Sequence, residues 1–211
     1  MPADDTAMGT SSGGSDSSSG GPGSKATNGW ASPSIIGLLA FGMTTMLYGL
    51  SNLPKPYGNG FVGYGGVPYT ELILGGLVLL LAGLIALYKN HTFWGSAFLG
   101  WGAFWGSWAF VSTGAHAYGA AGIAFVWLLF TLTFLISSMK HGWGTFFLFL
   151  FLFVGMILLV IEFWQGGAAN SISSSEKWAV GGVWIATGLI AWYLGTADLT
   201  NHSYSKKVLP T

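Results

Sequence analysis

Long uncharged stretches of apolar residues recur along this chain, and short polar or glycine-rich connections separate them. A helix rises 1.5 Å per residue, so about 20 residues are enough to cross a hydrocarbon core of about 30 Å. The pattern therefore predicts an all-α membrane protein with six transmembrane helices. These are expected over residues 34–53, 69–88, 92–113, 117–139, 143–164 and 177–197.

The first apolar stretch has polar groups along one face. Ser32 is placed to cap this helix by accepting a hydrogen bond from a backbone N–H, and Pro33 suits the first helical position. Spacings of three or four residues put on one face Ser34, Leu38, Phe41, Thr45, Tyr48 and Asn52. Hydroxyl and amide groups within lipid need partners in a helix bundle or along a wet path. The pattern leaves two interpretations open, which are helix packing and the wall of a pore.

The composition limits the class of protein and the chemistry it can use. Hydrophobic residues make up 52% of the chain and charged residues 7%, whereas a soluble domain has about 25% charged residues. The net charge of zero argues against nucleic-acid binding. The chain has no Cys and no Arg, so anion recognition depends on hydroxyls, amides, backbone N–H groups or Lys. The 34 glycines suit close helix packing, for example at Gly182 and Ala186.

The two ends of the chain differ from its apolar middle. Residues 1–29 are rich in Gly and Ser and are expected to form a disordered tail, residues 30–200 hold the six helices, and residues 201–211 form a C-terminal tail. With six spans, one side of the membrane holds Lys25, Lys89, Lys140, Lys206 and Lys207, and the other holds Lys55 and Lys177. Since the lysine-rich side is normally cytoplasmic, both termini are expected in the cytoplasm, with the protein in the cell membrane.

Acidic residues near the ends of the spans are the first candidates for chemistry. Glu71, Glu162 and Asp198 are each either an interfacial anchor or a functional group, and Glu162 is the candidate for carrying a proton. The four histidines lack the spacing of a metal site, and no nucleophile elbow or phosphate-binding loop is present. The sequence therefore predicts no enzyme activity, no metal and no cofactor.

Three segments resemble one family of transporters. The stretch S-P-S-I-I-G-L-L-A-F-G-M-T-T, residues 32–45, is similar to the signature N-P-A-P-L-G-L-x-x-F-G-M-T-T of the succinate–acetate permeases, the acetate uptake transporters. Residues 75–105 fit the family's G-G…A-G…N-T-F-G…A-F…Y-G-x-F-W segment without a gap, and residues 206–210 resemble its R-T-V-L-P tail. The resemblance covers about residues 30–211.

The resemblance implies a hexamer with a pore inside each protomer. In the family, three side chains form an apolar constriction, and they correspond here to Phe41, Trp101 and Leu152. The third span carries an aromatic face around Trp101, for which spacing alone favours packing over a pathway and leaves both open. Trp101 replaces a Tyr of the family, and Leu79 replaces a polar Gln. These differences predict a narrower or less polar pore, which favours acetate over succinate.

We therefore expect transport of acetate, or of a similar short monocarboxylate, by channel-like or proton-coupled movement. The side chains expected along the pore, besides the constriction, are Ser32, Ser34, Leu38, Thr45, Tyr48, Asn52 and Leu79. The expected partners are the substrate, the lipid bilayer and further copies of the chain. Two alternatives stay open: a channel for another small solute, such as ammonia, another weak acid or a dissolved gas, and a membrane sensor or scaffold without flux.

Overall fold

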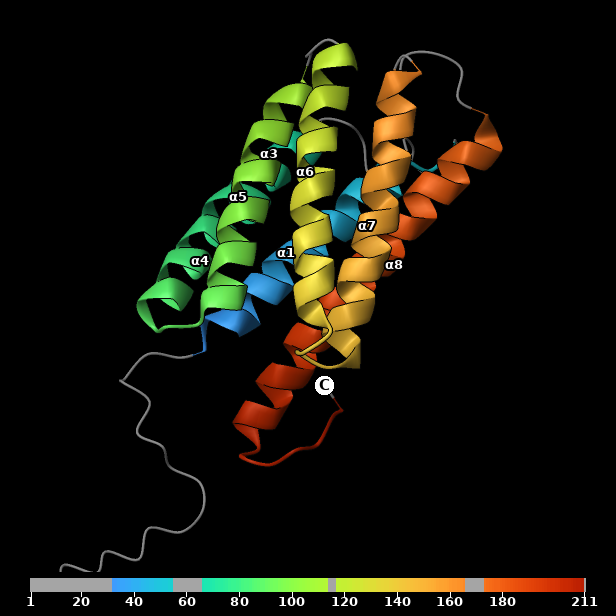
Figure 1. Ribbon diagram of the computed structural model, residues 1–211. Helices are drawn as coiled ribbons and strands as arrows, with labels where there is room; N and C mark the ends of the chain where they lie inside the picture. The colour runs from blue at the N-terminus through green and yellow to red at the C-terminus, as the bar shows by residue number, and fades with distance from the viewer. Residues whose placement is uncertain (1–31, 55–65, 114–116, 166–172, 211) are drawn as a thin grey trace, which may run out of the picture. The chain divides into compact units, whose positions relative to one another are not determined.

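The computed structural model describes residues 32–54, 66–113, 117–165 and 173–210, and every regular element in these ranges is a helix. Their order is α1 (Pro33–Ser51), α3 (Val67–Thr70), η1 (Glu71–Val78), α4 (Leu79–Tyr88), α5 (Thr92–Ser112), α6 (Ala117–Ser138), α7 (Trp143–Trp164) and α8 (Ser174–Ser203), as labelled in Figure 1. The run from α3 through the π-helical η1 to α4 is continuous. The predicted tail, residues 1–29, and Lys55 lie outside the described residues.

Each of the six predicted stretches coincides with a helix or a continuous helical run. Five of the described helices have the length and hydropathy of a membrane span: Pro33–Ser51, Val67–Tyr88, Gly119–Ser138, Trp143–Trp164 and Ser174–Ser203. The remaining helix, α5, has 21 residues and no charge, but its many tryptophans and glycines lower its mean hydropathy. The protein is thus an all-helical, multi-pass membrane protein, and the number of six spans stays a prediction.

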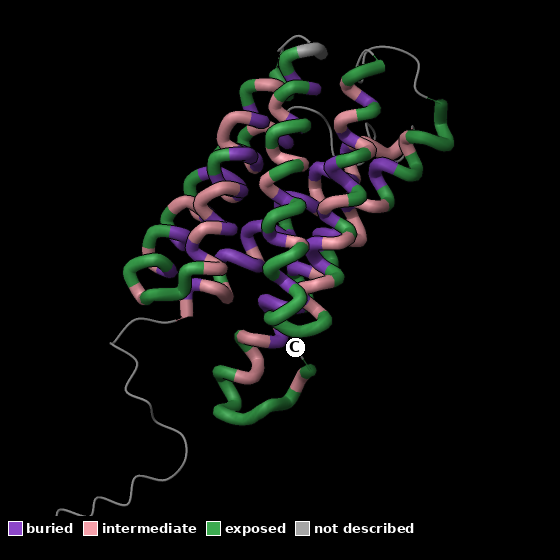
Figure 2. Tube along the Cα trace, viewed as in Figure 1, coloured by how far each residue is buried: buried purple, intermediate pink, exposed green. Residues whose placement is uncertain are grey.

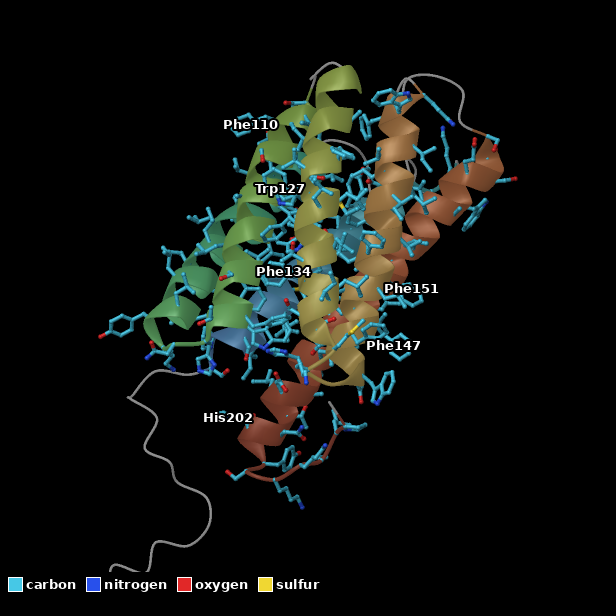
Figure 3. The ribbon with its side chains drawn as sticks, in the orientation of Figure 1. Phe110, Trp127, Phe134, Phe147, Phe151 and His202 are labelled. Atoms are coloured by element: carbon cyan, nitrogen blue, oxygen red, sulfur yellow. The ribbon has the colours of Figure 1, made fainter. Side chains whose placement is uncertain are left out.

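The outward sides of the helices are apolar, like the inward sides. Figure 2 shows buried residues on the helix sides that face other helices and exposed residues on the opposite sides. The exposed side chains include Leu81, Leu84, Phe110, Phe125 and Ile136. In Figure 3, Phe147 and Phe151 point outward from α7. An apolar outer surface of this extent indicates contact with lipid or with another subunit rather than with water.

Two helices begin differently from the sequence predictions. Ser32 does not cap α1, because its hydroxyl pairs with the Ser34 hydroxyl at 2.7 Å and accepts no hydrogen bond from a backbone N–H of the helix. The helix α8 begins before the predicted residue 177, because Ser173 and Glu176 form a capping box. The Ser173 N–H donates to Glu176 Oε2 at 2.6 Å, and the Glu176 N–H donates to Ser173 Oγ at 3.3 Å. This reciprocal pair is the usual signal of a helix start.

Backbone meets backbone where α1 packs against α8. A Cβ atom added to Gly42 would lie 2.7 Å from the Trp192 backbone nitrogen and 2.8 Å from the Gly188 carbonyl oxygen. Two turns along, a Cβ at Gly49 would lie 2.7 Å from the Ile185 nitrogen. At Gly182, where close packing was expected, nothing of the same chain lies within 4 Å of the Cβ position. The α1–α8 contact therefore depends on glycines other than the predicted one.

Gly188→Ala is expected to lower the free energy of unfolding by roughly 1–3 kcal/mol. The new Cβ would lie 2.6 Å from the Met46 backbone nitrogen and 2.7 Å from the Gly42 carbonyl oxygen, so the two helices must separate. Thermal unfolding of the detergent-solubilised protein measures the loss. The matched control is Gly182→Ala on the same helix, which meets open space. Equal unfolding temperatures for the two variants would contradict the α1–α8 contact.

Candidate functional site

Three helices bring the predicted constriction residues to one small apolar pocket, here called the throat. Phe41 of α1, Trp101 of α5 and Leu152 of α7 all line it. The other lining residues are Trp94, Ala97, Phe98 and Phe149. The rings of Phe41 and Trp101 meet edge to face, with centroids 5.4 Å apart. The space left is about 10 Å³ for the centre of a water-sized sphere, roughly the least that admits one water molecule.

A second aromatic group, here called the Tyr48 cluster, lies further along the same helices. Tyr48 of α1 meets Trp105 of α5 with ring centroids 5.6 Å apart and Trp184 of α8 at 5.2 Å. Trp108 completes the cluster, with its ring centroid 6.3 Å from that of Tyr48. Phe41 and Tyr48 share one face of α1, and Trp101 and Trp105 share one face of α5. The throat and the Tyr48 cluster are therefore successive layers between the same two helices.

The remaining residues predicted to line the pore divide into a buried middle and half-buried ends. Leu38, Thr45 and Leu79 are buried. Ser32, Ser34 and Asn52 are half-buried, and the Asn52 side chain donates from Nδ2 to the Tyr48 carbonyl oxygen at 2.9 Å. The predicted face of α1 thus lies inside the bundle along its length, with polar groups at both ends.

Glu71 and Glu162 are buried, which contradicts their interpretation as interfacial anchors. Glu71 is 1% exposed and Glu162 is 3% exposed. The Ser112 hydroxyl donates to Glu71 Oε2 at 2.9 Å. Glu71 Oε1 and Glu162 Oε2 have no hydrogen-bond partner among the described residues.

Glu162 also lines an open pocket between α7 and α8. The pocket has about 120 Å³ of space for the centre of a water-sized sphere. Its polar lining residues are Glu162, Gln165 and Glu176, and its other walls are apolar. Lys177 lies within electrostatic range of the Glu162 carboxyl. In the described ranges, no group of three or more His, Asp or Glu side chains is placed to hold a metal ion.

Sequence reasoning missed Trp184 and the buried position of the carboxyls. Trp184 lies on α8 between two glycines, Gly181 and Gly188, that bring α8 against α1. The spacing of these two glycines could have revealed Trp184, because small residues on one side of a helix indicate the side that packs against other helices. For Glu71 and Glu162, the distance from the end of a span gives depth but not the direction in which the side chain points.

A protein-family model matches most of the chain, including the helices that line the throat. The model described as the GPR1/FUN34/yaaH family matches residues 19–211. The chain belongs to this family. Membership of the GPR1/FUN34/yaaH family confirms the resemblance to succinate–acetate permeases stated from the sequence motifs.

Relatives from bacteria, archaea and fungi cover most of the chain. The succinate-acetate/proton symporter SatP of Escherichia coli is 30% identical over 188 residues, which cover 85% of this chain and 94% of SatP. An uncharacterized protein of Methanothermobacter thermautotrophicus is 32% identical over 205 residues, covering 86% of this chain and 91% of that protein. Acetate permease A of Emericella nidulans is 26% identical over 204 residues, covering 86% of this chain and 65% of the permease.

A solved structure has the same fold as this GPR1/FUN34/yaaH protein. The structure of the bacterial acetate channel SatP superposes with a TM-score of 0.73 at 28% identity. The superposition covers 86% of this chain and 98% of SatP. The helices that carry the throat and the Tyr48 cluster therefore belong to a fold that a channel protein also uses.

Proposed function

We propose that this protein moves acetate, or a similarly short monocarboxylate, across a membrane through a pore inside each protomer. The single observation that carries the proposal is the throat, where Phe41, Trp101 and Leu152 come from three helices to one apolar pocket. The similarity to SatP and to acetate permease A supports acetate as the substrate. Plasma-membrane location, cytoplasmic termini and a hexameric assembly belong to the same proposal.

The throat gives the pore its selectivity in this proposal. A bare carboxylate is costly to bring into an apolar passage. Hydroxyl and amide groups before and after the passage replace part of its water. On α1 these are Ser32 and Ser34 on one side of the throat and Thr45 and Asn52 on the other. The bulk of Trp101 restricts the passage to short acids.

Movement through the pore is either channel-like or coupled to protons, and Glu162 is the proposed proton carrier in the coupled case. Glu162 is buried, one of its oxygens has no partner, and it borders an open pocket. A buried carboxyl that reaches an open pocket is able to exchange protons with water while it stays inside the protein. This placement supports the coupled case without excluding simple passage.

Proteoliposomes containing the purified protein are expected to take up radiolabelled acetate faster than protein-free liposomes. An imposed inward proton gradient separates the two modes, because only coupled transport accumulates acetate above its equilibrium distribution. If the protein speeds ammonia equilibration but takes up no acetate, ammonia rather than acetate is the transported solute. A correctly assembled oligomer that moves neither solute would instead favour a sensor or scaffold and contradict the proposal.

A further inference from the structure

Five hydrogen-bond donors inside the bundle have no partner among the described residues. They are the hydroxyls of Thr44 and Thr45 and the indole N–H groups of Trp101, Trp105 and Trp184. Buried polar groups in native proteins nearly always have a partner, so a cluster of free donors implies that something binds there. All five side chains are buried in the part of the bundle that contains the throat and the Tyr48 cluster.

The threonines of α1 differ from those of other helices in how their hydroxyls are used. The Thr131 hydroxyl donates to the carbonyl oxygen of Trp127 at 2.6 Å, and the Thr187 hydroxyl donates to that of Val183 at 2.8 Å. This bond to the carbonyl four residues back is the local option open to any helical threonine. Thr44 and Thr45 do not use it. Their hydroxyls remain available to a group that is not part of the helix.

The indole groups show the same contrast. Trp127 donates from Nε1 to the Gly100 carbonyl oxygen at 3.1 Å. Trp105 and Trp184, whose ring centroids are 6.0 Å apart, both have free N–H groups. These two rings come from α5 and α8 and both contact Tyr48. Free donors from two helices, α5 and α8, therefore lie on rings that contact one residue of α1.

Along α1, Thr45 lies between the throat and the Tyr48 cluster, to which Trp105 and Trp184 belong. Thr45 follows Phe41 by one helical turn and precedes Tyr48 by three residues, so all three share one face of α1. Gly75 of η1 allows α1 and α5 to come close here, since a Cβ at Gly75 would lie 2.7 Å from both Thr44 Cγ2 and Trp105 Cβ. The free indole N–H groups only donate and the free threonine hydroxyls can donate, whereas the free atoms of Glu71 and Glu162 are carboxyl oxygens.

We propose that Thr45, Trp105 and Trp184 form a subsite that binds the carboxylate of the substrate, next to the throat. This inference rests on the proposed function and adds to it the groups that hold the anion. An ionised carboxylate offers only acceptors, and two indole N–H donors together with a hydroxyl that can donate complement it. Hydrogen bonds to an ionised acceptor are also roughly twice as strong as neutral ones. The chain has no Arg, so in this subsite hydroxyl and indole groups supply the hydrogen-bond donors that a guanidinium supplies in other proteins.

The subsite also orients the substrate. With the carboxylate held by the hydroxyl and indole donors, the methyl group of acetate points toward the apolar side chains of Phe41 and Leu152. The apolar end of the molecule then enters the throat first, while the charge stays on its donors. A second carboxylate, as in succinate, would have to enter the throat, where it would meet the apolar side chains of Phe41 and Leu152 and one free donor, the indole N–H of Trp101.

Thr45→Val and Trp184→Phe test the subsite, because each removes one donor; Thr45→Val keeps the shape of the side chain, and Trp184→Phe keeps an aromatic ring but is smaller. Equilibrium binding of radiolabelled acetate to the full-length, detergent-solubilised protein measures the effect. Each variant is expected to raise the dissociation constant roughly tenfold, as the loss of one hydrogen bond to a charged group does. Thr45→Ser keeps the hydroxyl and is expected to bind acetate like the wild type.

The matched controls remove donors that already have partners in the protein. Thr187→Val and Trp127→Phe are expected to leave acetate binding unchanged in correctly folded protein, because their groups donate to backbone carbonyls. Unchanged acetate affinity in Thr45→Val and Trp184→Phe, with normal acetate flux in the wild type, would overturn the subsite and leave the proposed function intact. The same holds if these variants lose only water permeability, since the donors would then hydrate a water path. A wild type that neither binds nor transports acetate would remove the proposed function itself.

Discussion

Trp101→Ala is expected to raise acetate flux per folded protein and to admit longer acids such as succinate. Trp101 is 2% exposed and closes the throat against Phe41 and Leu152. A narrow apolar constriction excludes water and bare anions by dewetting, so its bulkiest side chain sets most of the barrier. Each reduction of the barrier by about 1.4 kcal/mol raises the rate about tenfold. Acetate and succinate uptake into proteoliposomes, normalised to correctly assembled protein, measures the change.

Three further variants separate widening of the throat from loss of packing. Leu152→Ala is expected to act in the same direction as Trp101→Ala but less strongly, and Trp101→Tyr to change the substrate profile modestly. Trp143→Ala removes a tryptophan that is 77% exposed and is expected to leave flux unchanged. If Trp101 only packs between helices, its loss costs roughly 3–5 kcal/mol of stability. Normal assembly with unchanged flux and size selectivity in Trp101→Ala would exclude Trp101 from the pore.

Glu162→Gln is expected to abolish acetate accumulation driven by an inward proton gradient while leaving downhill acetate exchange in place. Glutamine keeps the shape of the side chain but cannot bind and release a proton. Glu162 is the buried carboxyl that reaches the pocket between α7 and α8, and one of its oxygens has no partner among the described residues. Uptake with and without the gradient, at equal acetate concentrations, measures the loss.

Glu176→Gln is the matched control for Glu162→Gln. Glu176 borders the same pocket, but it is exposed and its carboxylate accepts from Ser173 at the start of α8. Glutamine retains an acceptor for that bond, so accumulation is expected to continue. Accumulation that survives in Glu162→Gln would place the proton path elsewhere. A wild type that equilibrates acetate without accumulating it would make transport channel-like and give Glu162 no such role.

The positions of the helices were predictable because lipid excludes charge. The uncharged stretches coincide with the helices to within a few residues, except that α8 runs from Ser174 to Ser203. That early start carries a local signal, the Ser173–Glu176 capping box, which hydropathy does not contain. The π-helical η1 has no comparable signal, since it accompanies the packing of Gly75 against Thr44 and Trp105, which come from distant parts of the chain.

The candidate site was predictable only in part, because spacing along one helix does not tell which faces of several helices meet. The spacing of Phe41, Thr45 and Tyr48 predicts a common face, and the structure buries that face. The meeting of Phe41 with Trp101 and Leu152 came from the resemblance to a family, and their role in the pore stays a proposal. The free donors of Trp105 and Trp184 appear only when three helices are assembled.

The α1–α8 contact has a consequence for the order in which the chain becomes functional during synthesis. Gly42 and Gly188 touch through their backbones, although α1 is the first described helix to leave the ribosome and α8 is the last. Until α8 has entered the membrane, the glycine face of α1 has no partner, and Phe41 and Thr45 are not held in place by it. Contacts so distant along the chain form late and slowly. A nascent chain released before α8 is complete therefore contains all the helices that line the throat, but its throat residues are not held in fixed positions.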